Sequence, residues 1–184
     1  LLNYPIRVYK MDALINNINP INDLRALIEL SLFIKRNNFY IVHTHQSKAG
    51  IIGRIAAYLA KTPIIIHSIA GVSFFYSQNP IFQAILKSIE SFATHYTDVC
   101  ICVGKELAKL YLDSGIGTKR QYIIIPSPIE VDKFKKIAKL TTNQKQNIKT
   151  KFKLRTNVPI IGSAGNLEKN KGFDQLIMLS LIHI

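Results

Sequence analysis

The hydrophobic residues of this sequence form short runs that alternate with longer stretches in which an apolar residue recurs every three or four positions. Short apolar runs are typical of strands buried in a parallel sheet, and the longer periodic stretches are typical of amphipathic helices. Repeated alternation of the two predicts an α/β fold, a doubly wound parallel sheet with helices on both faces. Strands are predicted at residues 6–10, 39–43, 63–67, 99–103 and 122–125.

The first predicted helix, residues 20–36, has clear start signals. Asn19 can cap it, Pro20 suits its first turn, and the carboxylate of Asp23 favours the positive end of its dipole. A later helix starts with the same Asn-Pro pair at 79–80. The other helices are predicted from about 48 to 60 and from 105 to 113, and the apolar faces of the two Asn-Pro helices carry Ile21, Leu24, Ile28, Leu32, Ile81, Ile85, Ile89 and Phe92.

The pattern changes after Pro126 to a polar segment rich in Lys, Asn and Gln, which contains no buried strand and predicts a domain boundary near residue 130. A strand at 158–162 and a helix from about Gly172 follow it, and a single such unit cannot bury its own faces. The predicted organisation is a first domain over 1–130 with its beginning missing, a basic linker or helix over 131–156, and the truncated start of a second domain over 157–184.

Length and composition allow a globular chain. The 184 residues are 48% hydrophobic and 19% charged, which is unlike a disordered or collagen-like sequence. No apolar run reaches the about 18 residues that a membrane-spanning helix needs. The N-terminus does not have the pattern of a secretory signal and lacks an initiator Met, so we expect the sequence to start inside a longer protein.

The net charge of +13 indicates an anionic partner. Lys133 to Arg155 holds nine Lys or Arg and no acidic residue. Nucleic acid, an anionic membrane surface and a phosphorylated small molecule all fit such a segment, as does a basic helix face that is merely solvated. Cys100 and Cys102 lie in a predicted buried strand and are interpreted as reduced thiols of a cytoplasmic protein.

Polar residues follow the predicted strands at their carboxyl ends, where ligands of parallel α/β sheets bind. The first strand end carries His43, His45, Lys48 and Gly50, of which the lysine adds positive charge at a helix start. The two histidines are interpreted either as substrate contacts or as groups bonded to neighbouring backbone. A His-x-His pair lacks the remaining ligands of a metal site, so no metal is predicted.

Two further loops belong to the candidate site. His67 and Gly71 follow the next strand, and the three aromatic residues at 74–76 could stack on a sugar, contact an acyl chain or pack within the loop. The turn at 163–172 combines Gly, Asn and Lys between a strand and a helix, which suits a diphosphate. Neither Walker A nor G-x-G-x-x-G occurs in it.

The run from Ile41 to Arg54 resembles the segment DIVHTHSSKAGILGR of family 4 glycosyltransferases, which are retaining enzymes of the GT-B fold. Three more segments are similar in the same order. Residues 63–71 resemble P-x-I-I-H-T-x-H-G, residues 124–134 resemble I-P-N-G-I-D-x-x-x-F, and residues 161–172 resemble V-G-x-L-x-P-x-K-G. The resemblance covers nearly the whole chain.

The resemblance implies two Rossmann-like domains, with the acceptor bound mainly by the first and the nucleotide-sugar by the second. Carried over residue by residue, it implies that Gly165, Asn166 and Lys171 bind the donor diphosphate and that His67 is catalytic. His43, His45, Lys48, Gly50 and Gly71 would then bind the acceptor.

Three positions depart from the family pattern. Asn166 stands where many members have Arg, Ala70 replaces the second His of the cleft motif, and Ser127-Pro128 replaces Asn-Gly. The acidic E-x7-E motif and the glycine-rich loop of the family lie outside this sequence.

The sequence therefore predicts a fragment, inactive alone, of a retaining glycosyltransferase that moves a sugar from a nucleotide-sugar to a membrane-linked saccharide or polyprenyl-diphosphate acceptor in surface polysaccharide synthesis. No cofactor or metal is expected, and the location is cytoplasmic, with contact to the inner face of an anionic membrane. A catalytically inactive GT-B-like binding protein and a GT-B-fold nucleotide-sugar epimerase remain as alternatives. A nucleic-acid-binding module, favoured by charge alone, ranks below them.

Overall fold

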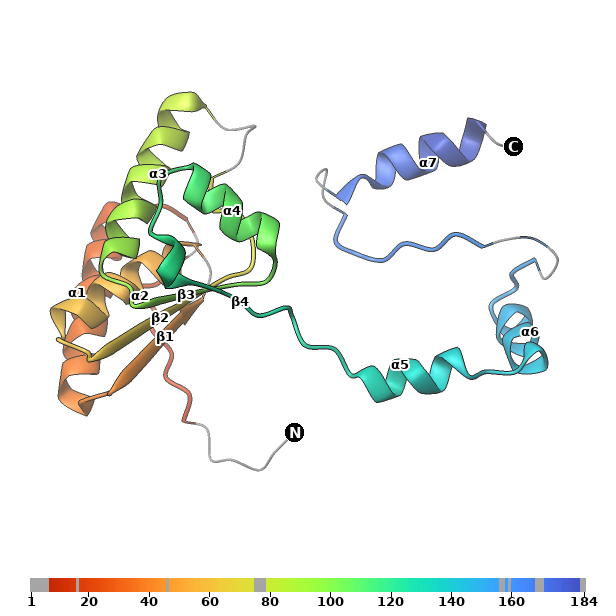
Figure 1. Ribbon diagram of the computed structural model, residues 1–184, viewed down its shortest axis with the longest axis horizontal. Helices are drawn as coiled ribbons and strands as arrows, with labels where there is room; N and C mark the ends of the chain where they lie inside the picture. Colours follow the sequence, from red (N-terminus) through yellow and green to blue (C-terminus); the bar gives the residue numbers. More distant parts are fainter. Residues whose placement is uncertain are drawn as a thin grey trace. The chain divides into compact units, whose positions relative to one another are not determined.

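The computed structural model describes residues 7–15, 17–45, 47–74, 79–155, 158, 160–167 and 171–182. The chain divides into two compact units, Leu1–Pro128 and Ile129–Ile184. Figure 1 labels the helices and strands of the described residues, with the sheet in the first unit.

The first unit contains a four-stranded sheet in the order β1-β2-β3-β4, formed by Ile41–His45, Ile64–Ile69, Val99–Cys102 and Tyr122–Ile124. All neighbouring pairs are parallel, with Thr44 opposite His67 and His67 opposite Cys100. The parallel α/β architecture predicted from the sequence is confirmed, and the carboxyl ends of all four strands lie at one edge of the sheet. A short 3-10 turn, Lys119–Gln121, leads into β4.

Four helices pack against the sheet: α1 (Pro20–Asn37), α2 (Ser47–Leu59), α3 (Pro80–His95) and α4 (Lys105–Asp113). The start signals of α1 act as expected, because the side chain of Asn19 accepts a hydrogen bond from the backbone N–H of Asn22 at 3.2 Å. Burial alternates along β2 and β3, where Ile65, His67, Ile69, Cys100 and Cys102 are the buried members. Figure 1 shows α1 to α4 on one side of the sheet, the side to which these buried residues point.

The opposite face of the sheet exposes apolar side chains. Ile41, Ile123 and Ile125 are 51%, 47% and 50% exposed, and His43 and His45 lie on this face too. Among the described residues of the first unit, no helix covers it. The helix layer predicted for both faces is therefore observed on one.

The apolar stripes singled out in α1 and α3 face outward, although such stripes ordinarily pack inward. Ile21 and Ile81 are 81% and 73% exposed, and the other members of both stripes are also exposed. α1 packs instead through Ala26 and Ile34, and α3 buries small and polar residues, namely Glu90, Ala93 and Thr94.

The strand predicted at 6–10 is wrong for the described residues 7–10, which are irregular; residue 6 lies outside the described part. Val8 and Tyr9 are 87% and 62% exposed. A strand needs a neighbour to accept and donate its backbone hydrogen bonds, and this segment has none among the described residues.

The second unit contains α5 (Val131–Ala138), α6 (Thr142–Lys151) and α7 (Phe173–Ile182). Thr141 and Gln144 form a capping box at the start of α6. The strand predicted at 158–162 is not formed at 160–162, since no neighbouring strand is described there to pair with it; residue 159 lies outside the described part. No residue whose burial is described between 129 and 180 is buried.

Candidate functional site

The carboxyl ends of β1 and β2 bring the predicted acceptor residues to one edge of the sheet. His43 pairs in register with Ile66, Thr44 with His67 and His45 with Ser68. Because side chains alternate along a strand, His67 points toward the helices, whereas His43 and His45 point to the uncovered face. The edge therefore carries imidazoles on both sides of the sheet.

His43 and His45 form an exposed pair. Their ring centroids are 4.3 Å apart, and Nε2 of His43 lies 2.8 Å from Oγ of Ser68. Partial burial, and to a lesser extent the nearby His45, lower the pKa of His43. A neutral imidazole beside a serine hydroxyl can exchange hydrogen bonds with the hydroxyl groups of a sugar.

His67 is 2% exposed and lies beneath the first turn of α2. Its Nδ1 is 2.8 Å from Oγ1 of Thr44, and that hydroxyl donates to the carbonyl of Ile66 at 3.3 Å. Since a hydroxyl has one proton, both bonds form together only when Nδ1 carries the proton of a neutral ring. Burial, with Arg54 as the next cause, lowers the pKa of His67 to about 3. From this position the ring reaches no solvent, so its catalytic role stays a prediction.

Two glycines let α2 lie directly on the strands. A Cβ on Gly50 would stand 2.3 Å from Cε1 of His67, and a Cβ on Gly53 would stand 2.7 Å from Cγ2 of Thr44. The space that the missing side chain of Gly50 leaves is filled by the His67 ring. Contact of Gly50 with substrate remains a prediction.

Lys48 has protein partners. Its ammonium forms an ion pair with Asp23 and donates hydrogen bonds to the carbonyls of Ile15 and Asn17. These contacts tie the start of α2 to α1 and to the segment before it. The predicted contribution of Lys48 to substrate binding would have to compete with them.

Arg54 and Glu90 form a buried ion pair that the sequence analysis missed. They are 0% and 1% exposed, with Nη2 of Arg54 2.6 Å from Oε1 of Glu90. Nη1 donates to Oγ1 of Thr94 at 3.2 Å, and Nε donates to the carbonyl of Gly50 at 3.0 Å. The available signal was an arginine inside the apolar run 51–60. Through Gly50 the pair helps to hold α2 against His67.

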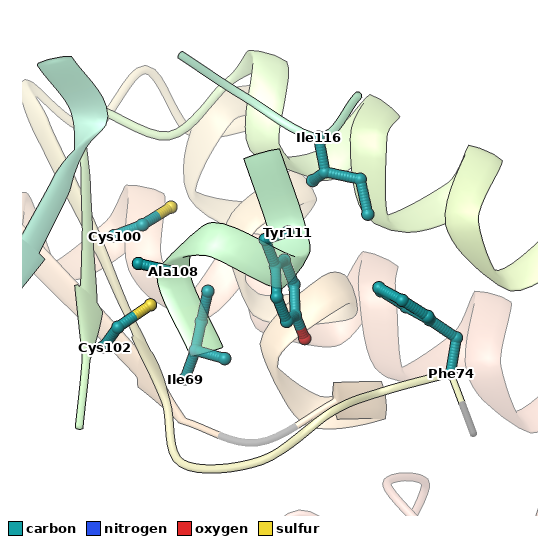
Figure 2. Packing of buried hydrophobic residues seen from close by; sticks show 7 residues of the cluster. All are labelled: Ile69, Phe74, Cys100, Cys102, Ala108, Tyr111 and Ile116. Carbon is teal, nitrogen blue, oxygen red and sulfur yellow. The ribbon is translucent and has the colours of Figure 1, made fainter. Parts of the chain in front are cut away.

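The loop after β2 contains two predicted substrate contacts, Gly71 and Phe74, which differ in exposure. Gly71 is exposed, but Phe74 is 4% exposed and packs with its ring centroid 5.3 Å from that of Tyr111. Phe74 is therefore part of the core shown in Figure 2 and does not stack on a sugar from this position. The other two aromatic residues of that prediction, 75 and 76, lie outside the described residues.

The predicted diphosphate residues belong to the second unit. Gly165 and Asn166 are exposed in an irregular segment before α7, and Lys171 is exposed just ahead of that helix. A Cβ on Gly165 would come within 3.4 Å of the Phe173 ring. Residues 168–170 of this turn lie outside the described part.

The described residues that could ligate a metal are dispersed, and the two cysteines are buried thiols. None of them form a group of three or more His, Cys, Asp or Glu side chains that could hold a metal ion. Cys100 and Cys102 are free and buried, as expected. Burial raises the pKa of Cys100 to about 12 and that of Cys102 to about 11, so both remain protonated thiols at neutral pH.

Comparison with known proteins identifies related sequences. Residues 5–133 match the family model described as Glycosyltransferase Family 4. The chain is 33% identical over 133 residues to the UDP-Gal:alpha-D-GlcNAc-diphosphoundecaprenol alpha-1,3-galactosyltransferase of Escherichia coli, covering 72% of this chain and 34% of that protein. It is 25% identical over 160 residues to the capsular polysaccharide biosynthesis glycosyltransferase CapM of Staphylococcus aureus, covering 85% of this chain and 40% of that protein.

A solved structure has a similar fold. The crystal structure of a glycosyltransferase from Rickettsia africae ESF-5 matches 95% of this chain and 44% of its own, with a TM-score of 0.64 and 22% identity. This match supports the Rossmann-like parallel α/β fold. The chain spans about a third to two-fifths of the length of the curated relatives, at 34% and 40%.

Proposed function

Since the chain belongs to Glycosyltransferase Family 4, we propose that the full-length protein transfers a sugar from a nucleotide-sugar to a polyprenyl-diphosphate-linked or other membrane-linked saccharide. The family match over residues 5–133 carries the proposal. The names of the two relatives, one with a diphosphoundecaprenol acceptor and one in capsular polysaccharide biosynthesis, support the substrate class.

The first unit would bind the acceptor. His43 and His45 present accessible imidazole nitrogens beside the Ser68 hydroxyl, and Gly71 leaves room for a saccharide at the same edge. His67 would support this edge from the helix-covered side of the sheet, because its hydrogen bond to Thr44 holds the ends of β1 and β2 together. Charge development in sugar transfer is stabilised best by groups that are already fixed in place.

The second unit would bind the donor. The ammonium of Lys171 would neutralise the departing nucleoside diphosphate, with the backbone of Gly165 and the amide of Asn166 as hydrogen-bond donors. All three residues are exposed in the second unit. A retaining reaction through an oxocarbenium-like centre fits this division and needs no metal.

The basic segment would hold the protein at an anionic membrane where the acceptor resides. α5 exposes Val131, Phe134 and Ile137, which are 48%, 57% and 52% exposed, among the lysines of the segment 133–155. Apolar side chains flanked by lysines favour contact with anionic lipid from the cytoplasmic side. Among the described helices, none has both the length and the apolar character needed to cross a bilayer.

The test is a transfer assay with the full-length protein, labelled nucleotide-sugars and a polyprenyl-diphosphate-linked saccharide in vesicles. We expect label in the lipid fraction only when acceptor is present. We also expect a large loss of transfer in Lys171→Ala but not in Lys109→Ala, which replaces an exposed lysine of α4 outside the basic segment. Conversion of the nucleotide-sugar without an acceptor would instead identify an epimerase.

Two other outcomes would also contradict transfer. Binding of nucleotide-sugar without turnover would identify a non-catalytic relative, an alternative that the replacement of His by Ala70 favours. Salt-sensitive binding to DNA or RNA, without any response to nucleotide-sugars, would support the nucleic-acid alternative.

A further inference from the structure

We propose that Tyr111 is a positioning residue whose hydroxyl fixes residues 71–73 and thereby shapes the acceptor end of the site. The inference rests on the proposed function, because it assigns the loop after β2 to the acceptor. It concerns a residue of α4 that belongs to none of the motifs by which the sequence resembles the family. The loop leaves β2 at Ile69 and re-enters the core at Phe74.

The phenolic oxygen of Tyr111 has three partners in this loop. It accepts the backbone N–H of Ser73 at 3.3 Å, lies 3.1 Å from Oγ of Ser73, and donates to the carbonyl of Gly71 at 3.4 Å. These contacts link residues 38 and 40 positions apart in the chain. One hydroxyl therefore fixes two backbone groups of a segment that has no regular secondary structure.

The tyrosine itself is held firmly. Its side chain is 1% exposed and packs with Ile69, Phe74 and Ile116 in the cluster drawn in Figure 2. The figure shows the hydroxyl end directed toward the side where the chain runs to Phe74. Burial raises the pKa of Tyr111, so the hydroxyl keeps its proton and remains a donor at neutral pH.

Both ends of the loop are anchored independently of the hydroxyl. Ile69 ends β2 and is 2% exposed, and Phe74 is 4% exposed. Nζ of Lys87, on α3, lies 5.1 Å from the centre of the Phe74 ring, a cation–π contact. The middle of the loop, Gly71 to Ser73, is held by the Tyr111 hydroxyl and by the packing of Val72 against the same cluster. Of these two restraints, only the hydroxyl fixes the backbone groups of Gly71 and Ser73, in the part that would face an acceptor.

Tyr122 offers a matched control. Its ring centroid is 6.4 Å from that of Tyr111, it packs against the same cluster, and its hydroxyl donates to the carbonyl of Ile116 at 2.9 Å. Tyr122→Phe thus also removes a hydroxyl bonded to backbone near this core, while leaving the bonds to Gly71 and Ser73 intact.

The experiment compares Tyr111→Phe and Tyr122→Phe in the full-length protein. The first readout is amide hydrogen exchange of Ser73, and the second is KM for acceptor against KM for donor. In Tyr111→Phe we expect exchange at Ser73 and KM for acceptor each to rise about five- to tenfold, as for the loss of one hydrogen bond, with KM for donor unchanged. Tyr122→Phe should leave all three unchanged.

Each outcome decides the matter. Unchanged exchange at Ser73 in Tyr111→Phe would overturn the proposal. Faster exchange with an unchanged KM for acceptor would overturn the positioning role but leave the transferase standing. If the wild-type protein transfers no sugar, the proposed function fails and the acceptor role fails with it, while the exchange of Ser73 still decides whether Tyr111 holds the loop.

Discussion

The backbone of Gly50 lies closer to the ring of His67 than a residue with a side chain could. This contact sets the distance between α2 and the ends of β1 and β2. A Cβ there would stand 2.3 Å from Cε1 of a ring that is itself buried. Overlap with a buried ring can be relieved only by moving the helix or the strand. The sequence analysis assigned Gly50 to the acceptor site and did not identify its packing against His67.

Gly50→Ala should therefore lower the free energy of unfolding by about 1–3 kcal/mol, the usual cost of overpacking a core. Urea denaturation of the full-length protein measures the change. Gly71→Ala serves as the control, because a Cβ there would meet no described atom within 4 Å. Equal effects of the two substitutions would show that His67 does not pack on Gly50.

His67 should make stability depend on pH. Its pKa is lowered from 6.5 to about 3 in the folded state, so below pH 6.5 the unfolded chain binds a proton that the folded chain does not. Stability is complete above about pH 6.5 and decreases as the pH falls toward 3. The charged and titratable groups that contribute to this shift are Arg54, His45 and His43.

His67→Gln should flatten this decrease, measured as urea midpoints between pH 7 and pH 4. His95→Gln, which replaces an exposed imidazole on α3, should retain the dependence of the wild-type protein. If His67→Gln and the wild-type protein lose stability in parallel as the pH falls, His67 is not the buried neutral group described above.

The helices α2 and α3 are joined by the buried Arg54–Glu90 pair, whose partners lie 36 positions apart in the sequence. Local periodicity could predict both helices, because capping residues and apolar spacing are local signals. It could not predict the pair, because nothing in the run around Arg54 indicates where its partner lies. Local periodicity also predicted the wrong inward faces for α1 and α3, since the apolar stripes that it identified are exposed. Tertiary packing, and not hydrophobicity alone, determines which face of a helix is buried.

Arg54→Met and Glu90→Gln, made singly, should each destabilise the protein, the first by about 3–5 kcal/mol because it leaves a buried carboxylate without its partner. The double variant should regain a large part of that loss, since both charges are then absent. Thermal unfolding of the four proteins completes a double-mutant cycle. Strictly additive losses would show that the two side chains do not interact.

At the scale of the whole molecule, the two units differ in how much they bury. The first has continuous cores around Cys100 and around Ala56, whereas no residue whose burial is described between 129 and 180 is buried. The parallel sheet was predictable because each strand is a local apolar run. The strand expected at 158–162 was not, because a strand forms only where neighbours complete its hydrogen bonds.

A peptide of residues 129–184 should therefore lack a cooperative unfolding transition. Ordering each residue costs about 1–2 kcal/mol in backbone entropy, and the described part of this unit has no buried side chain to offset that cost. Thermal circular dichroism of the isolated segment should give a gradual loss of helix signal. A sigmoidal transition would contradict the prediction.

The central claim is that the first unit binds the acceptor and the second binds the nucleotide-sugar. Steady-state kinetics of the full-length protein, with both substrates varied, test this assignment most directly. His43→Ala should raise KM for the acceptor about tenfold, as expected for lost polar contacts, and leave KM for the nucleotide-sugar unchanged; Lys171→Ala should do the reverse. If both variants affect the same substrate, or neither variant affects any, the assignment of these residues to separate substrates is wrong.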